Sequence, residues 1–543
     1  MCMNNLVDTK TLTGAKIVIE TLKKFGVDRI FGYPGGIVLK IYDELYCQNE
    51  IKHILVRHEQ AAVHAAEGYA RVTGKAGVVL VTSGPGATNT VTGIVNAYLD
   101  GFPLVVLTGQ VLSDLIGKDA FQEADICDMT KSCTKKVYQV TDVKELEQTL
   151  TDAFNTALSG KKGPVVVDLA KNILYEEAEF FGNIEQLSQK INHIDVIPAL
   201  KEICSANRPV IVTGGGSVNA STEVTEFARL LNIPVVSTMM GLGVFPQDNK
   251  NYLGMVGIFG DNSANQALRE CDLIFSIGAR FNDRITCCFA DGLKQKKFIQ
   301  LDINDKEISR SILAYMPLTG DAKTVLADMI SEFKTGKYTI GANWGTQIDN
   351  LKSIVRKRER KTNMLHSFEI MRELQKFLEG KDIVVTTEVG QHQLWAAQNL
   401  KFNKPLRFIT SGGSGTMGFG FPAAIGAAVA NTEKPVVCVT GDGSFQMNMQ
   451  ELAVCKDYSL PVKILVLNNG YLGMVRQLQE KQCNKRYCET KISNPDFVKL
   501  AQSYGIDAYR VSNKENILPI LQKAFEQKGT VLVEFIVEPM EVL

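Results

Sequence analysis

The chain has 543 residues, which corresponds to about three to four domains of typical size. Its 59 Lys and Arg residues balance 59 Asp and Glu residues, and this zero net charge argues against a protein that holds nucleic acid or anionic lipid through bulk charge. Hydrophobic residues make up 45% and charged residues 22%, as in ordinary globular proteins, so the composition also excludes extensive disorder.

Neither a membrane segment nor a targeting segment is predicted. The sequence contains no run of 18 or more apolar residues, and residues 1–5 lack the charged and apolar regions of a signal peptide. None of the 12 cysteines has the CxxC spacing of zinc ribbons or thioredoxin-like sites. We therefore expect a cytoplasmic protein with reduced cysteines, and neither nucleic acid nor membrane among its partners.

Short runs rich in Val, Ile and Leu alternate with helical stretches along the whole chain. Such runs predict buried parallel strands with helices on both faces of the sheet. The predicted strands are 29–32, 54–57, 77–82, 104–109, 164–169, 209–213, 234–237, 273–277, 298–301, 383–387, 436–440, 464–467 and 531–536. Polar, charge-rich stretches near 182–195 and 345–365 are predicted linkers. The fold class is thus α/β, with three doubly wound parallel-sheet domains over residues 1–185, 190–345 and 365–543.

The first and third domains resemble each other at a constant offset of 358 residues. The offset places Ala65 on Ala423 and Gly68 on Gly426, and 8 of the 18 positions from 65 to 82 are identical to their counterparts. We interpret the two domains as variants of one α/β unit. Two such units pair naturally around a quasi-two-fold axis, and the interface between them is a natural place for a ligand.

The strongest local motif is Gly-Asp-Gly-Ser at 441–444, directly after a predicted strand. A helix to Tyr458 and a further strand are predicted next, and that strand ends at Asn468-Asn469. A strand–helix–strand crossover places both strand ends at one edge of a parallel sheet, so Asp442 and Asn469 are expected to lie close together. Their oxygens suit Mg²⁺, and free N–H groups at the helix start suit a diphosphate.

This motif resembles that of the thiamin-diphosphate-dependent enzymes. The resemblance implies a cofactor whose diphosphate lies on the bound metal. The metal ligands that it implies are Asp442, Asn469 and the Tyr471 carbonyl, beside the cofactor-binding residues Gly441, Gly443 and Ser444.

The resemblance also implies a glutamate from the N-terminal domain of a partner subunit, which contacts the cofactor's aminopyrimidine and helps to activate it. Glu59 fits this role, because it follows the predicted strand 54–57. The offset of 358 places Glu59 on Met417, where the family has a bulky apolar residue that bends the cofactor.

Further motifs narrow the resemblance to the acetohydroxyacid (acetolactate) synthases, over nearly the whole chain. They include Gly-Tyr-Pro-Gly-Gly at 32–36, Asp-Ala-Phe-Gln-Glu at 119–123 and Val-Gly-Gln-His-Gln at 389–393. The implied cofactor contacts are Gln391, His392, Gly415 and Met474. Gly36, Gln122 and Lys171 are the further implied catalytic residues, and Phe121, Arg284 and Leu478 line the implied substrate pocket.

The central domain resembles the FAD-binding domain of these enzymes, in which the flavin does no net redox work. The residues implied to hold FAD are Gly214, Gly215, Arg280, Asp302 and Asp321. Two departures stand out. Phe259 replaces a histidine that the family often has near the flavin, and Leu478 replaces a tryptophan that shapes the preference for 2-oxobutyrate.

The resemblance implies that two pyruvates form 2-acetolactate and CO₂, as the first common step of branched-chain amino-acid synthesis, or that pyruvate and 2-oxobutyrate form 2-aceto-2-hydroxybutyrate. It implies a homodimer with active sites at the subunit interface, and leaves open a tetramer and a small regulatory subunit. The alternatives are a FAD-free fermentative acetolactate synthase, another thiamin-diphosphate decarboxylase or carboligase, and a non-catalytic nucleotide-binding homologue.

Overall fold

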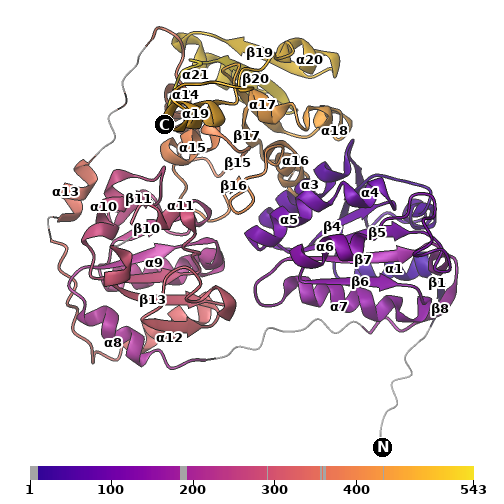
Figure 1. Ribbon diagram of the computed structural model, residues 1–543, viewed down its shortest axis with the longest axis horizontal. Coiled ribbons are helices and arrows are strands. Elements are labelled where there is room, and N and C mark those ends of the chain that lie inside the picture. Colours follow the sequence, from indigo (N-terminus) through magenta and orange to yellow (C-terminus); the bar gives the residue numbers. More distant parts are fainter. Residues whose placement is uncertain are drawn as a thin grey trace, which may run out of the picture.

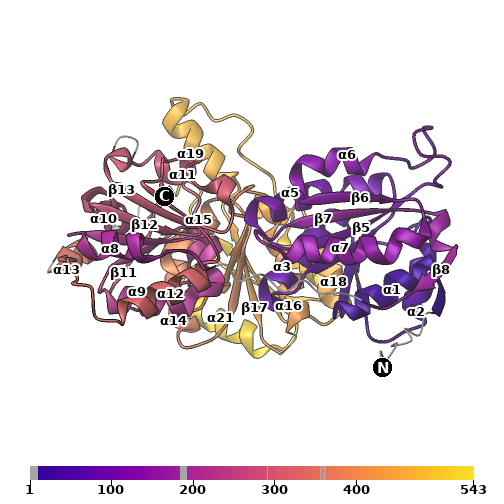
Figure 2. The same cartoon turned by 90° about the horizontal axis from the view of Figure 1, so that it is seen from below.

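The computed structural model consists of three α/β lobes, each built around a six-stranded parallel sheet (Figures 1 and 2). The structure describes residues 10–183, 193–289, 292–345, 347–354, 358, 362–431 and 433–543. This confirms the predicted fold class. Residues 1–5 and most of the predicted linker at 182–195 lie outside the described residues. Part of the second linker does too, and the part that is described includes helix α13 (Gln347–Ser353).

The N-terminal lobe has the strand order β3-β2-β4-β5-β7-β6. Its strands are β2 (Arg29–Gly32), β3 (Lys52–Leu55), β4 (Gly77–Val81), β5 (Leu104–Gln110), β6 (Lys136–Val140) and β7 (Pro164–Ala170). Its helices are α1 (Gly14–Lys24), α2 (Leu39–Tyr46), α3 (Glu59–Thr73), α4 (Pro85–Thr88), α5 (Val91–Asp100), α6 (Ile126–Thr130) and α7 (Leu146–Leu158). Strands β1 (Lys10–Thr13) and β8 (Glu177–Phe180) form a separate antiparallel pair.

The central lobe has the strand order β11-β10-β9-β12-β13-β14. Its strands are β9 (Pro209–Thr213), β10 (Val235–Ser237), β11 (Tyr252–Met255), β12 (Leu273–Ile277), β13 (Lys297–Asp302) and β14 (Met316–Thr319). Its remaining helices are α8 (Ile197–Ser205), α9 (Ser221–Leu230), α10 (Asn262–Glu270), α11 (Asp283–Thr286) and α12 (Ala322–Phe333).

The C-terminal lobe has the strand order β16-β15-β17-β18-β20-β19. Its strands are β15 (Val384–Thr387), β16 (Phe408–Thr410), β17 (Val436–Gly441), β18 (Val462–Asn468), β19 (Asp507–Val511) and β20 (Val531–Ile536). Its helices are α14 (Ser367–Leu378), α15 (Gln391–Asn399), α16 (Gly420–Ala430), α17 (Asp442–Phe445), α18 (Leu452–Asp457), α19 (Gly473–Gln482), α20 (Phe497–Ser503) and α21 (Ile517–Glu526).

The N-terminal and C-terminal lobes share one topology, because each strand of the first sheet has a counterpart at the same place in the third. Helices α3 and α16 pack against each other where the two lobes meet, within one shared hydrophobic core. A Cβ atom at Gly68 would run into the Ala423 carbonyl oxygen, and one at Gly426 would run into the Ala65 carbonyl oxygen. The offset of 358 places Gly68 on Gly426 and Ala65 on Ala423, so it converts one contact into the other. The internal repeat is therefore a quasi-two-fold pairing of two helices.

The single helix predicted after the motif at 441–444, ending at Tyr458, is wrong as one element. The chain forms the short helix α17, leaves helical geometry at Asn448 and resumes with the 3-10 turn Met449–Glu451 and α18. The buried Asn448 side chain donates to the Gly418 carbonyl at 2.6 Å. This bond to a neighbouring loop takes the place of continued helical pairing.

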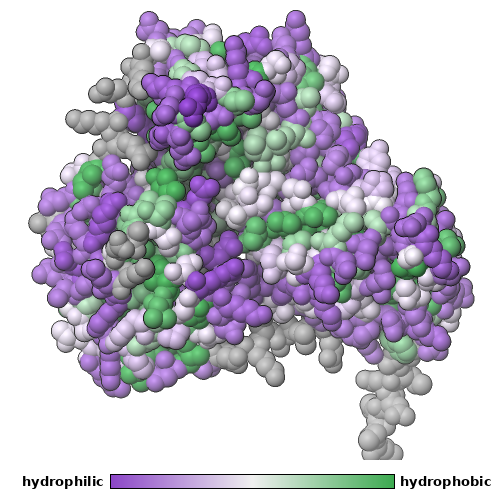
Figure 3. All heavy atoms as spheres, viewed as in Figure 1, coloured by the Kyte–Doolittle hydropathy of each residue, from purple (hydrophilic) through white to green (hydrophobic). Residues whose placement is uncertain are grey.

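Polar residues cover most of the face that Figure 3 shows, and apolar residues gather where the lobes approach each other. No helix among the described residues is long and apolar enough to cross a membrane.

Candidate functional site

Asp442 and Asn469 lie together at the carboxyl edge of the C-terminal sheet, where β17 and β18 end side by side. The Asp442 carboxylate is 2% exposed, and its Oδ2 accepts hydrogen bonds from the Gly470 N–H at 2.8 Å and from Asn494 Nδ2 at 2.7 Å. Burial raises the pKa of Asp442 to about 6. A carboxylate held at such an electrostatic cost is suited to a cation.

A cavity of about 70 Å³ lies over this edge. Ten of the residues predicted to hold the cofactor and the metal line it: Gln391, His392, Met417, Gly441, Asp442, Gly443, Ser444, Asn469, Tyr471 and Met474. The motif after β17 and Asn469 after β18 therefore face one space, as their spacing in the sequence predicts.

Glycines keep this cavity open. A Cβ atom at Gly441 would lie 2.7 Å from His392 Nδ1, and one at Gly473 would lie 2.8 Å from Asn469 Nδ2 and would run into Gln391 Oε1. The backbone at these two turns therefore approaches the polar side chains as closely as only glycine permits.

His392 and Gln391, the first residues of α15, present different groups to the cavity. Burial lowers the pKa of His392 to about 3, and its Nε2 has no hydrogen-bond partner. In contrast, Gln391 Nε2 donates to Gln477 Oε1 at 2.8 Å and to the Glu541 carbonyl at 3.0 Å. His392 Nε2 is thus available to bind a ligand, whereas the amide nitrogen of Gln391 is already bonded to Gln477 and Glu541.

The residues present fit a magnesium diphosphate. No group of three His, Cys, Asp or Glu side chains clusters as a metal site among the described residues. The predicted ligands are instead one carboxylate, one amide oxygen and one backbone carbonyl. Asn469 Oδ1 accepts the Tyr471 N–H at 2.9 Å, so a tight turn places all three beside one another. Such an oxygen set leaves positions for water and phosphate, as Mg²⁺ requires.

Glu59 lies in the other lobe, as the first residue of α3. Its Oε2 accepts a hydrogen bond from Asn89 Nδ2 at 3.0 Å, and a Cβ atom at Gly86 would lie 3.6 Å from its Oε1. The preceding residue, His58, caps the helix by accepting the Gln60 N–H at 3.2 Å. Glu59 thus has a fixed position with one carboxylate oxygen held and the other beside a glycine.

The other residues predicted for the N-terminal lobe gather on the carboxyl side of the same sheet, and Glu59 does not line either cavity described in this subsection. The Lys171 N–H donates to the Gln110 carbonyl at 3.0 Å, which joins the ends of β5 and β7. The side chain of Phe121 is 88% exposed, and a Cβ atom at Gly36 would meet open space. Gln122, with φ of 60°, packs its backbone against Gly84. This half of the predicted site is open to solvent in the single chain.

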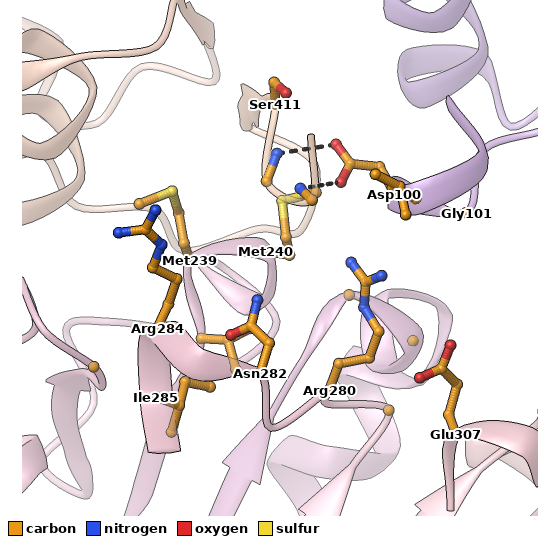
Figure 4. Close-up of a pocket in the computed structure, with 18 of the residues that line it drawn as sticks. Asp100, Gly101, Met239, Met240, Arg280, Asn282, Arg284, Ile285, Glu307 and Ser411 are labelled. Atoms are coloured by element: carbon orange, nitrogen blue, oxygen red, sulfur yellow. Dashed lines mark hydrogen bonds between the residues drawn. The ribbon is translucent and has the colours of Figure 1, made fainter. Parts of the chain in front are cut away.

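A larger cavity of about 570 Å³ lies where the three lobes meet (Figure 4). The predicted residues that line it are Gly215, Arg280, Arg284, Asp302, Asp321, Gly415, Met474 and Leu478. It shares Val389, Gly390 and Met474 with the smaller cavity, so the two adjoin. The structure thus brings the predicted flavin residues next to the predicted thiamin diphosphate residues.

The donors of the larger cavity fit a dinucleotide. Arg280 and Arg284 both extend from the central lobe into the cavity, and guanidinium groups suit phosphates (Figure 4). Asp302 is the last residue of β13 and Asp321 follows β14, and carboxylates there suit sugar hydroxyls. The volume lies in the usual range of ligand pockets. Gly214 differs from the prediction, because it does not line the cavity and instead packs on Gly278 and Ala279.

Four buried or half-buried groups were missed by the sequence reasoning. Asn494 bonds to Asp442, and Glu388 accepts the Phe421 N–H at 2.9 Å at the start of α16. Glu451 accepts the Arg57 N–H at 3.0 Å, two residues before Glu59, and Asp100 bonds to the loop that carries Gly415. All four meet distant parts of the chain, and no local motif marks them.

Models of known protein families match all three lobes. The N-terminal TPP binding domain of thiamine pyrophosphate enzymes matches residues 12–129, their central domain matches residues 196–329, and their C-terminal TPP binding domain matches residues 388–535.

Close relatives cover nearly the whole chain. The acetolactate synthase large subunit of Haemophilus influenzae is 42% identical over 536 residues, which span 96% of this chain and 93% of that protein. The acetolactate synthase isozyme 3 large subunit of Escherichia coli is also 42% identical, over 95% of this chain and 92% of its own. The probable acetolactate synthase large subunit of Methanocaldococcus jannaschii is 41% identical over 98% and 93%. The chain therefore belongs to the acetolactate synthase large subunits, a family of thiamine pyrophosphate enzymes.

Proposed function

We propose that this protein condenses two molecules of pyruvate to 2-acetolactate and CO₂ with thiamin diphosphate and Mg²⁺, as the first common step of branched-chain amino-acid biosynthesis. The observation that supports this most is the small cavity, where the buried Asp442 carboxylate, the Asn469 turn and the unpartnered His392 Nε2 converge. A turn with a purely structural role would not explain why a buried carboxylate and an imidazole nitrogen without a hydrogen-bond partner face the same cavity.

Bound thiamin diphosphate supplies a carbon nucleophile and an electron sink for decarboxylation. The chain's own residues orient and activate it. Asp442, Asn469 and the Tyr471 carbonyl would hold the metal, and His392 Nε2 would face the diphosphate. Glu59 would hydrogen-bond the aminopyrimidine through the oxygen that Asn89 leaves free. By exchanging a proton with that ring, it would help a ring nitrogen to accept the proton that leaves the cofactor's reacting carbon.

We infer that each active site takes its two halves from two chains. Neither cavity of the chain is lined by the predicted residues of the N-terminal lobe, which are Glu59, Gly36, Phe121, Gln122 and Lys171. The metal half, in contrast, lines the smaller cavity. Phe121 is 88% exposed, and Leu112, Leu115 and Met129 of the N-terminal lobe are exposed apolar residues as well. Such a surface is typical of a subunit interface. A homodimer that joins the N-terminal edge of one copy to the C-terminal edge of the other completes the site, and two dimers can form a tetramer.

The larger cavity is proposed to hold FAD in a structural role. Arg280 would meet its phosphates, with Asp302 and Asp321 near the adenosine half. The yellow colour of the purified protein and the spectrum of flavin released on denaturation test this. A colourless protein that is fully active would instead favour the FAD-free type of acetolactate synthase.

Pyruvate is the proposed preferred acceptor. Leu478 lines the larger cavity, where the family usually has tryptophan, so the surface that selects the longer 2-oxobutyrate is altered. With equal concentrations of both acids, we expect 2-acetolactate to exceed 2-aceto-2-hydroxybutyrate, and Leu478→Trp to shift the ratio toward the latter. The names of the relatives also support a separate small regulatory subunit, which co-purification with a tagged chain would test. A cytoplasmic location stays a prediction for cell fractionation.

The function is tested by product analysis with pyruvate, thiamin diphosphate and Mg²⁺. We expect one CO₂ for each acetolactate formed, loss of activity after chelation and dialysis, and recovery when both cofactors return. Acetaldehyde as the main product would identify a decarboxylase, and no CO₂ release from the reconstituted protein would identify a non-catalytic homologue. Either result would overturn the proposal.

A further inference from the structure

The loop between β16 and α16 is held by a carboxylate from another lobe. Asp100, the last residue of α5, accepts the Gly413 N–H through Oδ1 at 2.7 Å and the Gly412 N–H through Oδ2 at 3.1 Å (Figure 4). The Asp100 side chain is 0% exposed. Because both carboxylate oxygens bond to successive backbone N–H groups away from water, Asp100 fixes the path of this loop.

Arg71 of α3 supports Asp100 from behind. Its Nη2 lies 2.7 Å from Asp100 Oδ2, and its Nη1 donates to the Thr410 carbonyl at 2.9 Å, where the loop begins. The Arg71 side chain is 1% exposed, so the ion pair is sealed from solvent. Arg71 also pairs with the buried Glu67, so Asp100 belongs to a cluster of two carboxylates and one guanidinium.

The far end of the loop is tied to the same lobe. Asn96 Oδ1 accepts Ser411 Oγ at 2.5 Å and Thr416 Oγ1 at 3.1 Å, and all three side chains are buried. Asn96 Nδ2 donates in turn to Glu67 Oε2 at 2.9 Å. Hydrogen bonds from one buried polar network of the N-terminal lobe thus hold both ends of the loop.

The loop also runs too close to its neighbours to accept side chains. A Cβ atom at Gly412 would run into Met240 Sδ, and one at Gly413 would lie 2.7 Å from Leu99 Cβ. Asp100 and the two glycines line the larger cavity, as Gly415 does, and Met417 lines the smaller one. A shift of the clamped glycines would therefore move both.

We propose that Asp100 is a positioning residue for thiamin diphosphate, which sets the places of Gly415 and Met417 by clamping Gly412 and Gly413. This rests on the proposed function, in which the aminopyrimidine binds between these two groups. The N-terminal lobe then serves two sites in different ways, because it positions the cofactor loop of its own chain through Asp100 and supplies Glu59 to its partner.

The test compares Asp100→Asn with Asp28→Asn in the full-length protein. Asp28 also bonds to α3, through Tyr69 Oη at 2.5 Å, but lines neither of the two cavities. Calorimetric titration of the Mg²⁺-saturated apoprotein with thiamin diphosphate gives the Kd of the cofactor. We expect Asp100→Asn to raise this Kd by about tenfold or more, as for loss of a charged hydrogen bond, and to leave the KM for pyruvate within about twofold. Asp28→Asn should bind the cofactor as the wild type does.

A second variant changes the loop itself and leaves the Asp100 carboxylate in place. Gly413→Ala keeps Asp100 and should also weaken cofactor binding, because its Cβ would press on Leu99. Wild-type affinity in both loop-directed variants would overturn the proposal, and so would an equal loss in Asp28→Asn. If the wild-type protein itself does not bind thiamin diphosphate, the proposed function fails instead, so the two failures are distinguishable.

Discussion

Glu59 is the residue on which the proposed chemistry depends most. Glu59→Gln keeps the size of the side chain and an oxygen for Asn89, but the amide cannot take and return a proton. We expect acetolactate formation to fall by about 10²–10⁴-fold, with unchanged melting temperature and cofactor affinity. Glu50→Gln, at a side chain that is 70% exposed, is the matched control. Near-normal turnover by Glu59→Gln would remove this glutamate from the mechanism.

Glu388 makes stability depend on pH. Burial raises its pKa to about 7 from the usual 4.5, and its Oε2 has no partner. Between about pH 4.5 and pH 7 the folded protein therefore binds one more proton than the unfolded chain does. The free energy of unfolding falls as the pH rises through this range, and it stays at the lower value above pH 7. Glu388→Gln should melt close to the wild type near pH 5 and a few degrees higher at pH 8. Melting curves that differ equally at both pH values would contradict this origin.

The predictable part of the site is the part that local sequence encodes. Asp442 and Asn469 follow two adjacent parallel strands, so spacing alone brings them together. Asn494 reaches Asp442 from a later loop, and Asp100 reaches Gly413 from another lobe. No periodicity or motif connects such pairs, because their contact arises only from the packing of whole elements.

At the scale of elements, the crossing of α3 and α16 sets how the two similar lobes meet. Gly426 faces the Ala65 carbonyl, and a Cβ atom there would also lie 2.8 Å from the Tyr69 nitrogen. Gly426→Ala should therefore destabilise the protein by about 1–3 kcal/mol, although alanine favours helices. Gly529→Ala is the control, since a Cβ atom there meets nothing. Urea unfolding measures both, and equal stability of the two variants would refute the close crossing.

Interior strands follow from the sequence, but most edge strands do not. Seven of the described strands were not predicted. β6, β11, β14, β16 and β19 lie at the edges of the six-stranded sheets, and β1 and β8 form the separate antiparallel pair. β6 and β19 have only one buried residue each, because one neighbour and a solvent-facing side leave room for polar residues. The break in the helix after β17 could not be predicted either, because it depends on the hydrogen bond from Asn448 to the distant Gly418 carbonyl and not on the local sequence.

At the scale of the whole molecule, the two groups of proposed active-site residues of one chain lie apart. Asp442 and Asn469 line a cavity at the C-terminal edge, whereas Glu59 and Phe121 lie at the N-terminal edge and line neither cavity. The quasi-two-fold pairing of α3 and α16 joins the lobes within a chain without bringing these edges into one cavity. The proposed active site therefore needs one half from each of two chains.

Complementation between two inactive variants measures this directly. Co-expressed Glu59→Gln and Asp442→Asn chains form a mixed dimer in which one site has both changes and the other has neither. We expect each variant alone to be inactive and the random mixture to form acetolactate at about a quarter of the wild-type rate, because half of the dimers are mixed and half of their sites are intact. A mixture as inactive as either variant alone would show that Glu59 and Asp442 serve a site within one chain, and would contradict the account.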